Sequence, residues 1–225
     1  ADLKFKVAVS EEELFDRAEA DVLRIARNMR DEGLPIVSFN ASRKSRSSVI
    51  TKLIAKKENI AATIFDKLRF RIVVRRPMDL VPVLAYMVRE VFPFNYVIPG
   101  ESHNNLLDPI SLLDFLRDPS DLQDLLEEPD VQTSGKNEFS SQGYRMINYI
   151  VDYPVLLPRE KVPGFGFELG RVVFLMVEFQ LVDAETARTN ELGDNAHHLY
   201  KDRQRRVVSR RLKRGAAWKR RKKVD

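Results

Sequence analysis

Three features of the sequence predict an α+β fold. The chain has 225 residues, 44% of them hydrophobic, which suits one large domain or one domain with appendages. Near its start, apolar residues recur at helical spacing: Leu14, Ala18, Val22, Ile25, Ala26 and Met29. Further along, residues 172–177 are continuously apolar, as in a buried strand. We therefore expect helices and strands around one core.

The first helix is bounded by its own capping residues. Ser10, with Glu13 three residues later, forms a capping-box pattern, and Gly33 supplies a C-terminal stop. After residues 35–39, a polar and basic stretch, residues 40–48, leads into a short helix from Val49 to about Lys57. A loop that enters a helix in this way is a favourable anion site.

Strand and helix patterns alternate through the rest of the chain. Residues 68–75 alternate as a strand does, and a helix follows from about Met78 to Val91, with Pro82 at a kink or in the first turn. Residues 95–98 form a weaker strand. The remaining expected elements are an acidic insert at 101–140, a strand at 143–151, a Pro/Gly-rich turn at 154–166, a strand at 171–182 and a helix from about Ala184 into the tail.

Two polar residues end the most apolar strand. Glu178 and Gln180 are two positions apart, so they share one face of that strand. A buried carboxylate costs several kcal/mol unless a cation, a metal or hydrogen-bond donors meet it. The sequence therefore predicts a charged partner over this face.

Short groups of polar residues at predicted strand ends and in loops follow one another in a definite order along the chain. Its members are Lys44, Ser48 and Lys52; Asp66 and Arg71; Gly143 and Tyr144; Glu178 and Gln180; and Gly193, Ala196, His197, Tyr200 and Lys201. In this order and spacing, residues 40–202 resemble the synthetase domain of the RelA/SpoT family of (p)ppGpp alarmone synthetases. The resemblance implies a mixed, mainly five-stranded sheet flanked by helices, related to nucleotidyltransferases. It also implies a pyrophosphokinase that moves pyrophosphate from ATP to the 3′-OH of GDP or GTP.

The resemblance assigns the catalytic side to Asp66, Glu178 and Gln180. Asp66 and Glu178 would hold Mg²⁺ or Mn²⁺, and Glu178 would also take the proton from the attacking hydroxyl. Oxygen ligands fit a chain with no cysteine and with three histidines that lack a metal-finger spacing. Alternatives are a strand-initiating turn for Asp66 and an ion pair with Arg71 for Glu178.

The donor phosphates are assigned to the basic stretch. Lys44, Arg46, Ser48 and Lys52 would cradle the phosphates of ATP. Arg71 would bind a phosphate or a carboxylate. An ordinary basic surface loop is the alternative.

The acceptor side is assigned to three residues. Tyr144 would stack on the guanine, Gln142 stands where the family usually has an Asn, and His197 would lie near the acceptor pocket. The alternatives are a half-buried strand tyrosine and a helix histidine packed on the sheet.

Five positions depart from the family pattern. Ser140 replaces a Lys, Asn148 a His, Val182 an Arg, Ser42 an Arg, and Arg69 a Gly or other small residue. Most of these positions concern the acceptor. Two further functions therefore stay open, namely pyrophosphorylation of a tRNA 3′ end and a catalytically degenerate module that binds nucleotide or RNA.

The domains are expected at residues 1–40 (an N-terminal helical segment), 41–202 (the synthetase-like domain with the insert) and 203–225 (a basic tail). Residues 201–225 carry 13 Lys/Arg against 2 acids, or +11, which leaves 25 minus 31, or −6, for residues 1–200. A tail of this density around Trp218 favours a polyanion such as RNA, from tRNA or the ribosome. The alternatives are a solvated tail with no partner and a membrane-surface segment, which a thin apolar face disfavours.

The same sequence sets expectations about the cellular setting. No run approaches the ~18 apolar residues of a membrane span, and the first residues lack a secretory apolar core. The absence of cysteine fits a reducing compartment. We expect a cytoplasmic protein without a membrane partner, and an oligomer is compatible with the sequence.

Overall fold

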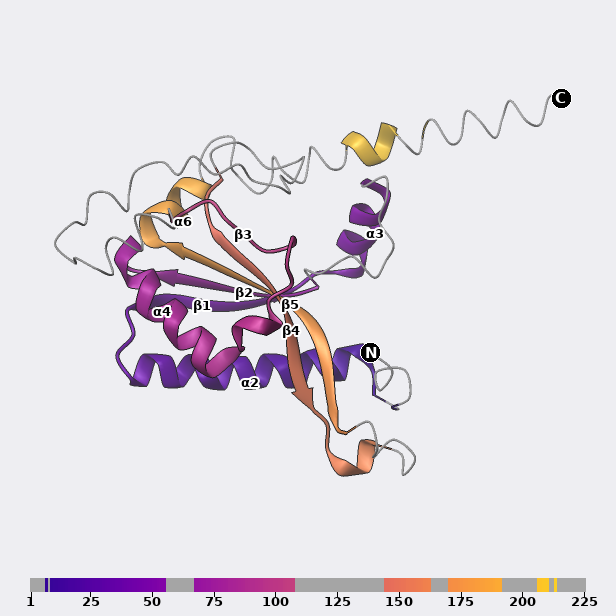
Figure 1. The fold of residues 1–225 in the computed structure, drawn as a ribbon. Helices are drawn as coiled ribbons and strands as arrows, with labels where there is room; N and C mark the ends of the chain where they lie inside the picture. The colour runs from indigo at the N-terminus through magenta and orange to yellow at the C-terminus, as the bar shows by residue number, and fades with distance from the viewer. Residues whose placement is uncertain are drawn as a thin grey trace.

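The computed structural model describes residues 7, 9–55, 67–107, 144–162, 170–191, 206–210 and 213. They form one five-stranded sheet in the order β1-β2-β5-β4-β3, with helices packed against it (Figure 1). Only β2 and β5 run parallel, and the other three neighbouring pairs are antiparallel. The predicted α+β fold with a mixed five-stranded sheet is confirmed.

The elements have the following bounds. The strands are β1 (Ile36–Arg43), β2 (Leu68–Val74), β3 (His103–Asn104), β4 (Ile147–Leu156) and β5 (Val172–Asp183). The helices are α2 (Glu11–Asp31), α3 (Arg46–Ala55), α4 (Leu80–Tyr86) and α6 (Ala184–Glu191). Short 3₁₀ turns span Pro77–Asp79, Phe94–Tyr96 and Arg159–Lys161, and a π-helical turn spans Met87–Val91.

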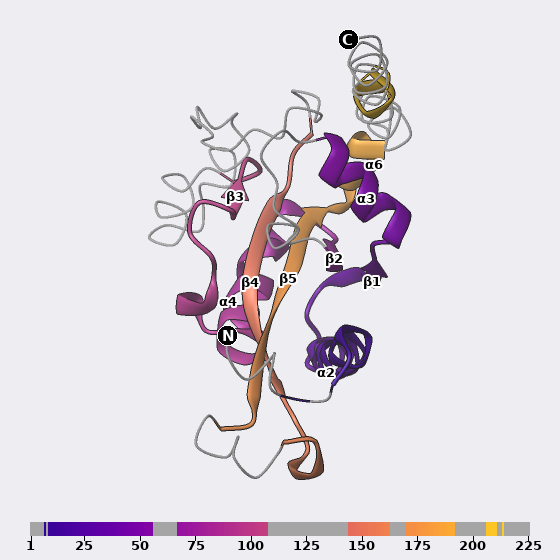
Figure 2. The same cartoon turned by 90° about the vertical axis from the view of Figure 1, so that its right-hand side faces the viewer.

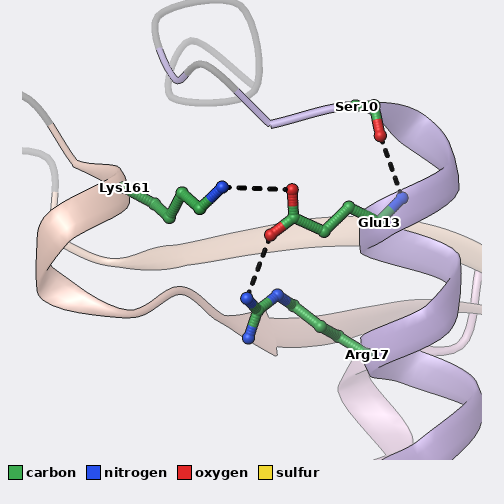
Figure 3. Close-up of polar contacts among 4 residues, drawn as sticks. All are labelled: Ser10, Glu13, Arg17 and Lys161. Carbon is green, nitrogen blue, oxygen red and sulfur yellow. Dashed lines mark hydrogen bonds and ion pairs between the residues drawn. The ribbon is translucent and has the colours of Figure 1, made fainter.

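The first helix follows its sequence pattern closely. All six residues predicted at helical spacing are buried in α2, and Gly33, with φ at 81°, ends the helix in the left-handed conformation. Ser10 Oγ accepts a hydrogen bond from Glu13 N at 3.1 Å. The Glu13 carboxylate accepts from Arg17 at 3.0 Å and from Lys161 at 3.4 Å (Figure 3). These contacts tie the start of α2 to the turn that follows β4.

Aromatic rings fix the register of the central strands. Phe70 of β2 stacks on Phe179 of β5, with ring centroids 5.2 Å apart, and Phe179 also contacts Phe92 at 5.1 Å. Phe39 meets Phe70 on the β1 side, and Tyr149 of β4 meets Phe92. A slip of one strand by one residue would turn its ring, Phe39, Phe70, Tyr149 or Phe179, to the opposite face of the sheet. The strands are therefore locked against one another at this level.

The sheet has two unlike faces. The inner face packs on α2 and α4, whose apolar residues share one core with Phe70 and Phe179 (Figure 1). On β2, residues 69, 71 and 73 alternate with this buried set and point to the other side, which we call the outer face. Beyond α2, the β4–β5 hairpin continues as a two-stranded extension that ends at Arg159–Lys161 (Figure 2). The polar residues in the central part of the outer face are therefore the candidates for a functional site.

The boundary between β1 and α3 was placed wrongly by sequence. Residues 40–43, expected in a loop, extend β1 because Arg43 pairs with Leu68 and binds Asp16 at 2.7 Å and Glu19 at 2.6 Å. The helix begins at Arg46 and not at Val49, because Ser45 Oγ accepts from Ser48 N at 3.3 Å and so acts as an earlier cap.

Two strand predictions also need correction. Residues 95–98 are not a strand: a 3₁₀ turn covers Phe94–Tyr96, and Val97 forms only an isolated bridge to Val151. The turn expected from Pro154 starts later, because β4 runs through Pro154 to Leu156. The N–H of Ile150 points away from β5 and donates to Ser102 Oγ. Pro154 lies four residues further along β4, so its nitrogen points to the same side as that of Ile150, away from β5. Its missing N–H therefore breaks no hydrogen bond between β4 and β5.

Other expectations are met where the structure describes them. The strands at 68–75 and 171–182 are confirmed as β2 and β5, and Pro82 lies in the first turn of α4. Of the acidic insert, residues 101–107 are described and 108–140 lie outside the described residues. In the described ranges, no helix has both the length and the apolar character to cross a membrane. The division of the chain into domains at residues 1–40, 41–202 and 203–225 remains a prediction.

Candidate active site

The buried carboxylate of Glu178 has a cationic partner, as the sequence predicted. Arg69 Nε donates to Glu178 Oε2 at 2.7 Å, and Gln180 Nε2 donates to Glu178 Oε1 at 2.8 Å. The Glu178 side chain is 7% exposed and that of Arg69 is 31% exposed. Both carboxylate oxygens therefore accept a hydrogen bond, and the negative charge of Glu178 is balanced by Arg69 on the neighbouring strand.

The partner is not the arginine that the sequence indicated. Arg71, expected as the alternative partner of Glu178, lies one row away, opposite Gln180. Its guanidinium is 3.8 Å from the exposed carboxylate of Glu191 in α6, at the outer limit of an ion pair. The register of the parallel β2–β5 pair decides this, because it aligns Arg69 with Glu178.

Residues aligned across the strands form two polar rows on the outer face. One row runs Ser42, Arg69, Glu178 and Ile150 from β1 to β4. The other spans all five strands as Asn40, Arg71, Gln180, Asn148 and His103. Residues in register on neighbouring strands face the same side. The outer face thus brings two guanidinium groups, a carboxylate, three amides and an imidazole into one patch.

Asn148 and His103 extend the patch toward β3. Asn148 is buried, and within the described part of the chain its Oδ1 has no hydrogen-bond partner. Burial lowers the pKa of the His103 imidazole, and the negative charge of Glu178 opposes part of that shift. A buried acceptor atom beside a neutral imidazole suits a ligand that brings N–H or O–H groups.

The predicted phosphate loop adjoins the first polar row. Ser42 lies opposite Arg69, and Lys44 N donates to Lys67 O at 2.9 Å, so the ladder continues into the turn before α3. At the start of α3, Ser45 Oγ lies 2.9 Å from Ser48 Oγ. A capped helix start beside cationic strand residues provides the N–H groups and positive charge that phosphates need.

The backbone around Tyr144 is held by two asparagines. Asn105 Nδ2 donates to Tyr144 O at 2.8 Å, and Asn105 Oδ1 accepts from Met146 N at 2.7 Å. Asn190 of α6 exchanges two hydrogen bonds with the backbone of Arg145, at 2.7 and 3.1 Å. Tyr144, half-buried, is therefore presented at the start of β4 by a fixed segment.

Several predicted site residues cannot be placed. Asp66, Gln142 and His197 lie outside the described residues. Arg46 and Lys52 lie on α3, but their side chains are not described. Their roles remain predictions.

The residues that sequence reasoning did not assign to the site are Arg69, Asn148 and His103. Arg69 and Asn148 carried a signal as departures from the family pattern. For His103 the sequence held no such signal, because its place beside Asn148 depends on a two-residue strand far away in sequence.

A divalent cation fits the described residues poorly. Mg²⁺ and Mn²⁺ prefer several oxygen ligands. In the described part of the chain, no group of three or more His, Cys, Asp or Glu side chains could hold a metal ion. The one carboxylate of the patch, Glu178, already accepts from Arg69 and Gln180. Without Asp66, these residues do not make a divalent-cation site.

Comparisons with known proteins give a mixed result. No family model matches the chain, and no curated protein matches its sequence. Among solved structures, it is similar to small alarmone synthetase 1 from Bacillus subtilis, with 15% identity, a TM-score of 0.48, and coverage of 93% of this chain and 92% of that one. A GTP pyrophosphokinase family protein from Streptococcus pneumoniae is similar at 13% identity and a TM-score of 0.46, over 93% of this chain and 91% of that one. Small alarmone synthetase 2 from Bacillus subtilis is similar at 15% identity and a TM-score of 0.46, over 94% of this chain and 98% of that one.

Proposed function

We propose that the chain is a pyrophosphokinase that transfers pyrophosphate from ATP to the 3′-OH of GDP or GTP and so makes (p)ppGpp. One observation carries the proposal. Glu178 and Gln180, the most specific pair of the sequence series, share a sheet face with two arginines beside the strand end that leads into α3. Phosphoryl-type transfer needs positioned phosphates, positive charge around them and a group that activates a hydroxyl. This face offers all three kinds of group.

The donor phosphates bind at the start of α3. Backbone N–H groups at a helix N-terminus and the Ser48 hydroxyl are suited to phosphate oxygens. Lys44 adds positive charge where β1 ends, and Arg46 and Lys52 are proposed from the sequence to contribute to the same cradle. Arg71, which meets Glu191 only at 3.8 Å, can turn toward a more strongly charged phosphate.

The reacting hydroxyl is activated at Glu178. The 3′-OH gives its proton to a Glu178 oxygen while the 3′-oxygen attacks the β-phosphorus of ATP. The bond from that phosphorus to the α–β bridging oxygen breaks, and AMP leaves. A carboxylate oxygen can accept more than one hydrogen bond, so the contacts with Arg69 and Gln180 orient Glu178 without saturating it.

The acceptor base is held beside β4. Tyr144, tied at its carbonyl by Asn105, presents a ring on which guanine stacks. Asn148 Oδ1 accepts a hydrogen bond from the acceptor nucleotide, which supplies the donor that this buried atom lacks in the described part of the chain. Gln142 and His197 are proposed from the sequence to complete this side.

Two observations favour other candidate functions. The basic tail, whose residues 206–210 are helical, together with the replaced acceptor residues favours pyrophosphorylation of a tRNA 3′ end. The Glu178 carboxylate, both of whose oxygens already accept a hydrogen bond from the chain, favours a module that binds nucleotide or RNA without turnover.

The deciding experiment follows label from γ-labelled ATP into separate samples of GDP, GTP and deacylated tRNA, with Mg²⁺ present. Glu178→Gln should lower transfer about a hundredfold or more, and Asp66→Asn tests the residue that lies outside the described ranges. Glu12→Gln, an exposed change on α2, is the matched control. Label on a guanine nucleotide supports the proposal, and label on tRNA supports the tRNA alternative. Retained nucleotide binding without transfer to any acceptor would overturn both enzymatic functions.

A further inference from the structure

The amide of Asn148 is an open polar group in the middle of the outer face. Asn148 is buried, and its Oδ1 has no hydrogen-bond partner in the described part of the chain. Its neighbours in the row leave it unpaired there, because Gln180 uses Nε2 to hold Glu178 and His103 donates nothing to Oδ1. Most buried polar atoms in folded proteins have a partner. An acceptor left open at this place therefore indicates a ligand that brings the donor.

The order of residues along β4 determines which part of a nucleotide reaches Asn148. Tyr144, the proposed stacking partner of the acceptor base, comes just before the strand. The row of Asn148 and Gln180 comes next, and the row that contains Glu178 follows it. A nucleoside with its base on Tyr144 and its 3′-OH at Glu178 therefore lays its ribose over the row of Asn148.

The Glu178 carboxylate is turned toward this row. Gln180 Nε2 donates to Glu178 Oε1 at 2.8 Å, so this oxygen faces the row that Gln180 shares with Asn148. Directly across on β4, Glu178 meets Ile150, whose buried side chain has no polar atom. Asn148 is the diagonal neighbour of Glu178, a relationship that places Cβ atoms about 7–8 Å apart, within reach of long side chains. Two neighbouring hydroxyl groups of one sugar can therefore meet the two side chains together.

We propose that Asn148 recognises the ribose of the acceptor: its Oδ1 accepts a hydrogen bond from the 2′-OH while Glu178 meets the neighbouring 3′-OH. The proposal rests on the proposed function and narrows its substrate class to ribonucleotides with both hydroxyl groups free. A 2′-deoxynucleotide leaves Oδ1 without a donor. The contact also orients the reacting oxygen, because a ribose held at both hydroxyl groups keeps its 3′-oxygen in one position.

Asp152 flanks the row of Glu178 on the opposite side. It is half-buried on β4, two residues past Ile150, and lies opposite Met176 of β5. A ribose that bound Asp152 would extend away from Tyr144, so the base could not stack there while the 3′-OH stays at Glu178. Asp152 therefore tests the direction in which the nucleoside lies.

Calorimetric titration of the full chain with GDP and with 2′-deoxy-GDP, both in Mg²⁺, tests the proposal. The wild type should bind 2′-deoxy-GDP about two- to tenfold more weakly than GDP, the effect of one hydrogen bond. Asn148→Ala should bind the two nucleotides with equal Kd. Asp152→Ala should keep the wild-type ratio, and so should the matched control Asn28→Ala, an exposed asparagine on α2.

Three results would overturn the inference. The first is equal affinity of the wild type for GDP and 2′-deoxy-GDP, a comparison that does not depend on the folding of any variant. The second is a preference for GDP that Asn148→Ala retains, with its fold confirmed by circular dichroism. The third is a preference that Asp152→Ala loses and Asn148→Ala keeps, which would place the sugar on the other side of the Glu178 row.

The label-transfer assay separates this inference from the proposed function. A wild type that prefers GDP through Asn148 but transfers no label keeps the ribose contact and loses the transferase. Transfer to GDP and to 2′-deoxy-GDP with equal kcat/KM keeps the transferase and removes the contact. A wild type that binds neither nucleotide and transfers no label removes both.

Discussion

Asn148 of β4 lies directly opposite Gln180 of β5 on the outer face of the sheet, and both side chains are buried. Gln180 donates to Glu178, whereas Asn148 Oδ1 has no partner within the described residues. Two amides in register thus differ in whether their hydrogen bonds are complete. Such a buried acceptor is a point at which a ligand can gain binding energy without breaking a contact of the protein.

Asn148→Ala is accordingly expected to weaken GDP binding by about two- to tenfold, because one hydrogen bond to the ligand is lost. The free energy of unfolding should fall by less than about 1 kcal/mol, since no protein contact of Oδ1 is removed. Isothermal calorimetry and urea unfolding measure the two quantities. Asn190→Ala is the control. It removes the two hydrogen bonds between the Asn190 side chain and the backbone of Arg145, so the free energy of unfolding should fall by about 1–3 kcal/mol. Equal losses of stability in both variants would argue against an available acceptor at Asn148.

The Arg69–Glu178 pair should appear as a coupling energy. Arg69→Gln leaves a buried carboxylate without its cation and should destabilise the chain by about 1–3 kcal/mol, less than for a fully buried pair because Arg69 is partly exposed. Adding Glu178→Gln removes the unpaired charge, so the double variant should recover part of that loss. Urea unfolding of both single variants and the double variant gives the coupling. Additive effects would show that the contact contributes nothing to stability.

The cap of α2 gives a test of the first helix. Ser10→Ala removes the acceptor of the 3.1 Å bond from Glu13 N and should lower the free energy of unfolding by about 1 kcal/mol. Ser10→Asp keeps an acceptor oxygen at the same place and should stay close to the wild type. Thermal and urea unfolding compare the three proteins. A loss of the same size in Ser10→Asp would rule out capping as the cause.

His103 predicts a dependence of stability on pH. Burial lowers the pKa of its imidazole in the folded chain, with Glu178 opposing part of the shift, so the folded state binds this proton less readily than the unfolded chain does. The contribution of His103 to stability is therefore present above the unfolded value of about 6.5 and is lost as the pH falls below it. His103→Gln should show a smaller drop in urea midpoint between pH 7.5 and 5.5 than the wild type. Identical drops would mean that His103 does not carry the effect.

Local patterns were sufficient wherever the deciding contacts are close in sequence. The burial of α2 follows its 3.6-residue period from Leu14 to Met29, and the strand alternation of β2 follows its period of two. Errors arose where a distant partner decides. β1 is longer than expected because Arg43 is held by Asp16 and Glu19, and β4 passes through Pro154 because that edge needs no donor there.

The candidate site divides in the same way. By itself, the sequence determined that Glu178 and Gln180 share one strand face and that a cation must meet the buried carboxylate, because alternation and the cost of burying charge are local facts. It indicated Arg71 as the ion-pair partner and not Arg69, because both lie on the same face of β2 and no local pattern distinguishes them. The tertiary structure chose Arg69, because the stacking of Phe70 on Phe179 sets the register of two strands that are more than a hundred residues apart in the chain. No local sequence pattern specifies that register, and the register decides which arginine lies beside Glu178 at the centre of the site.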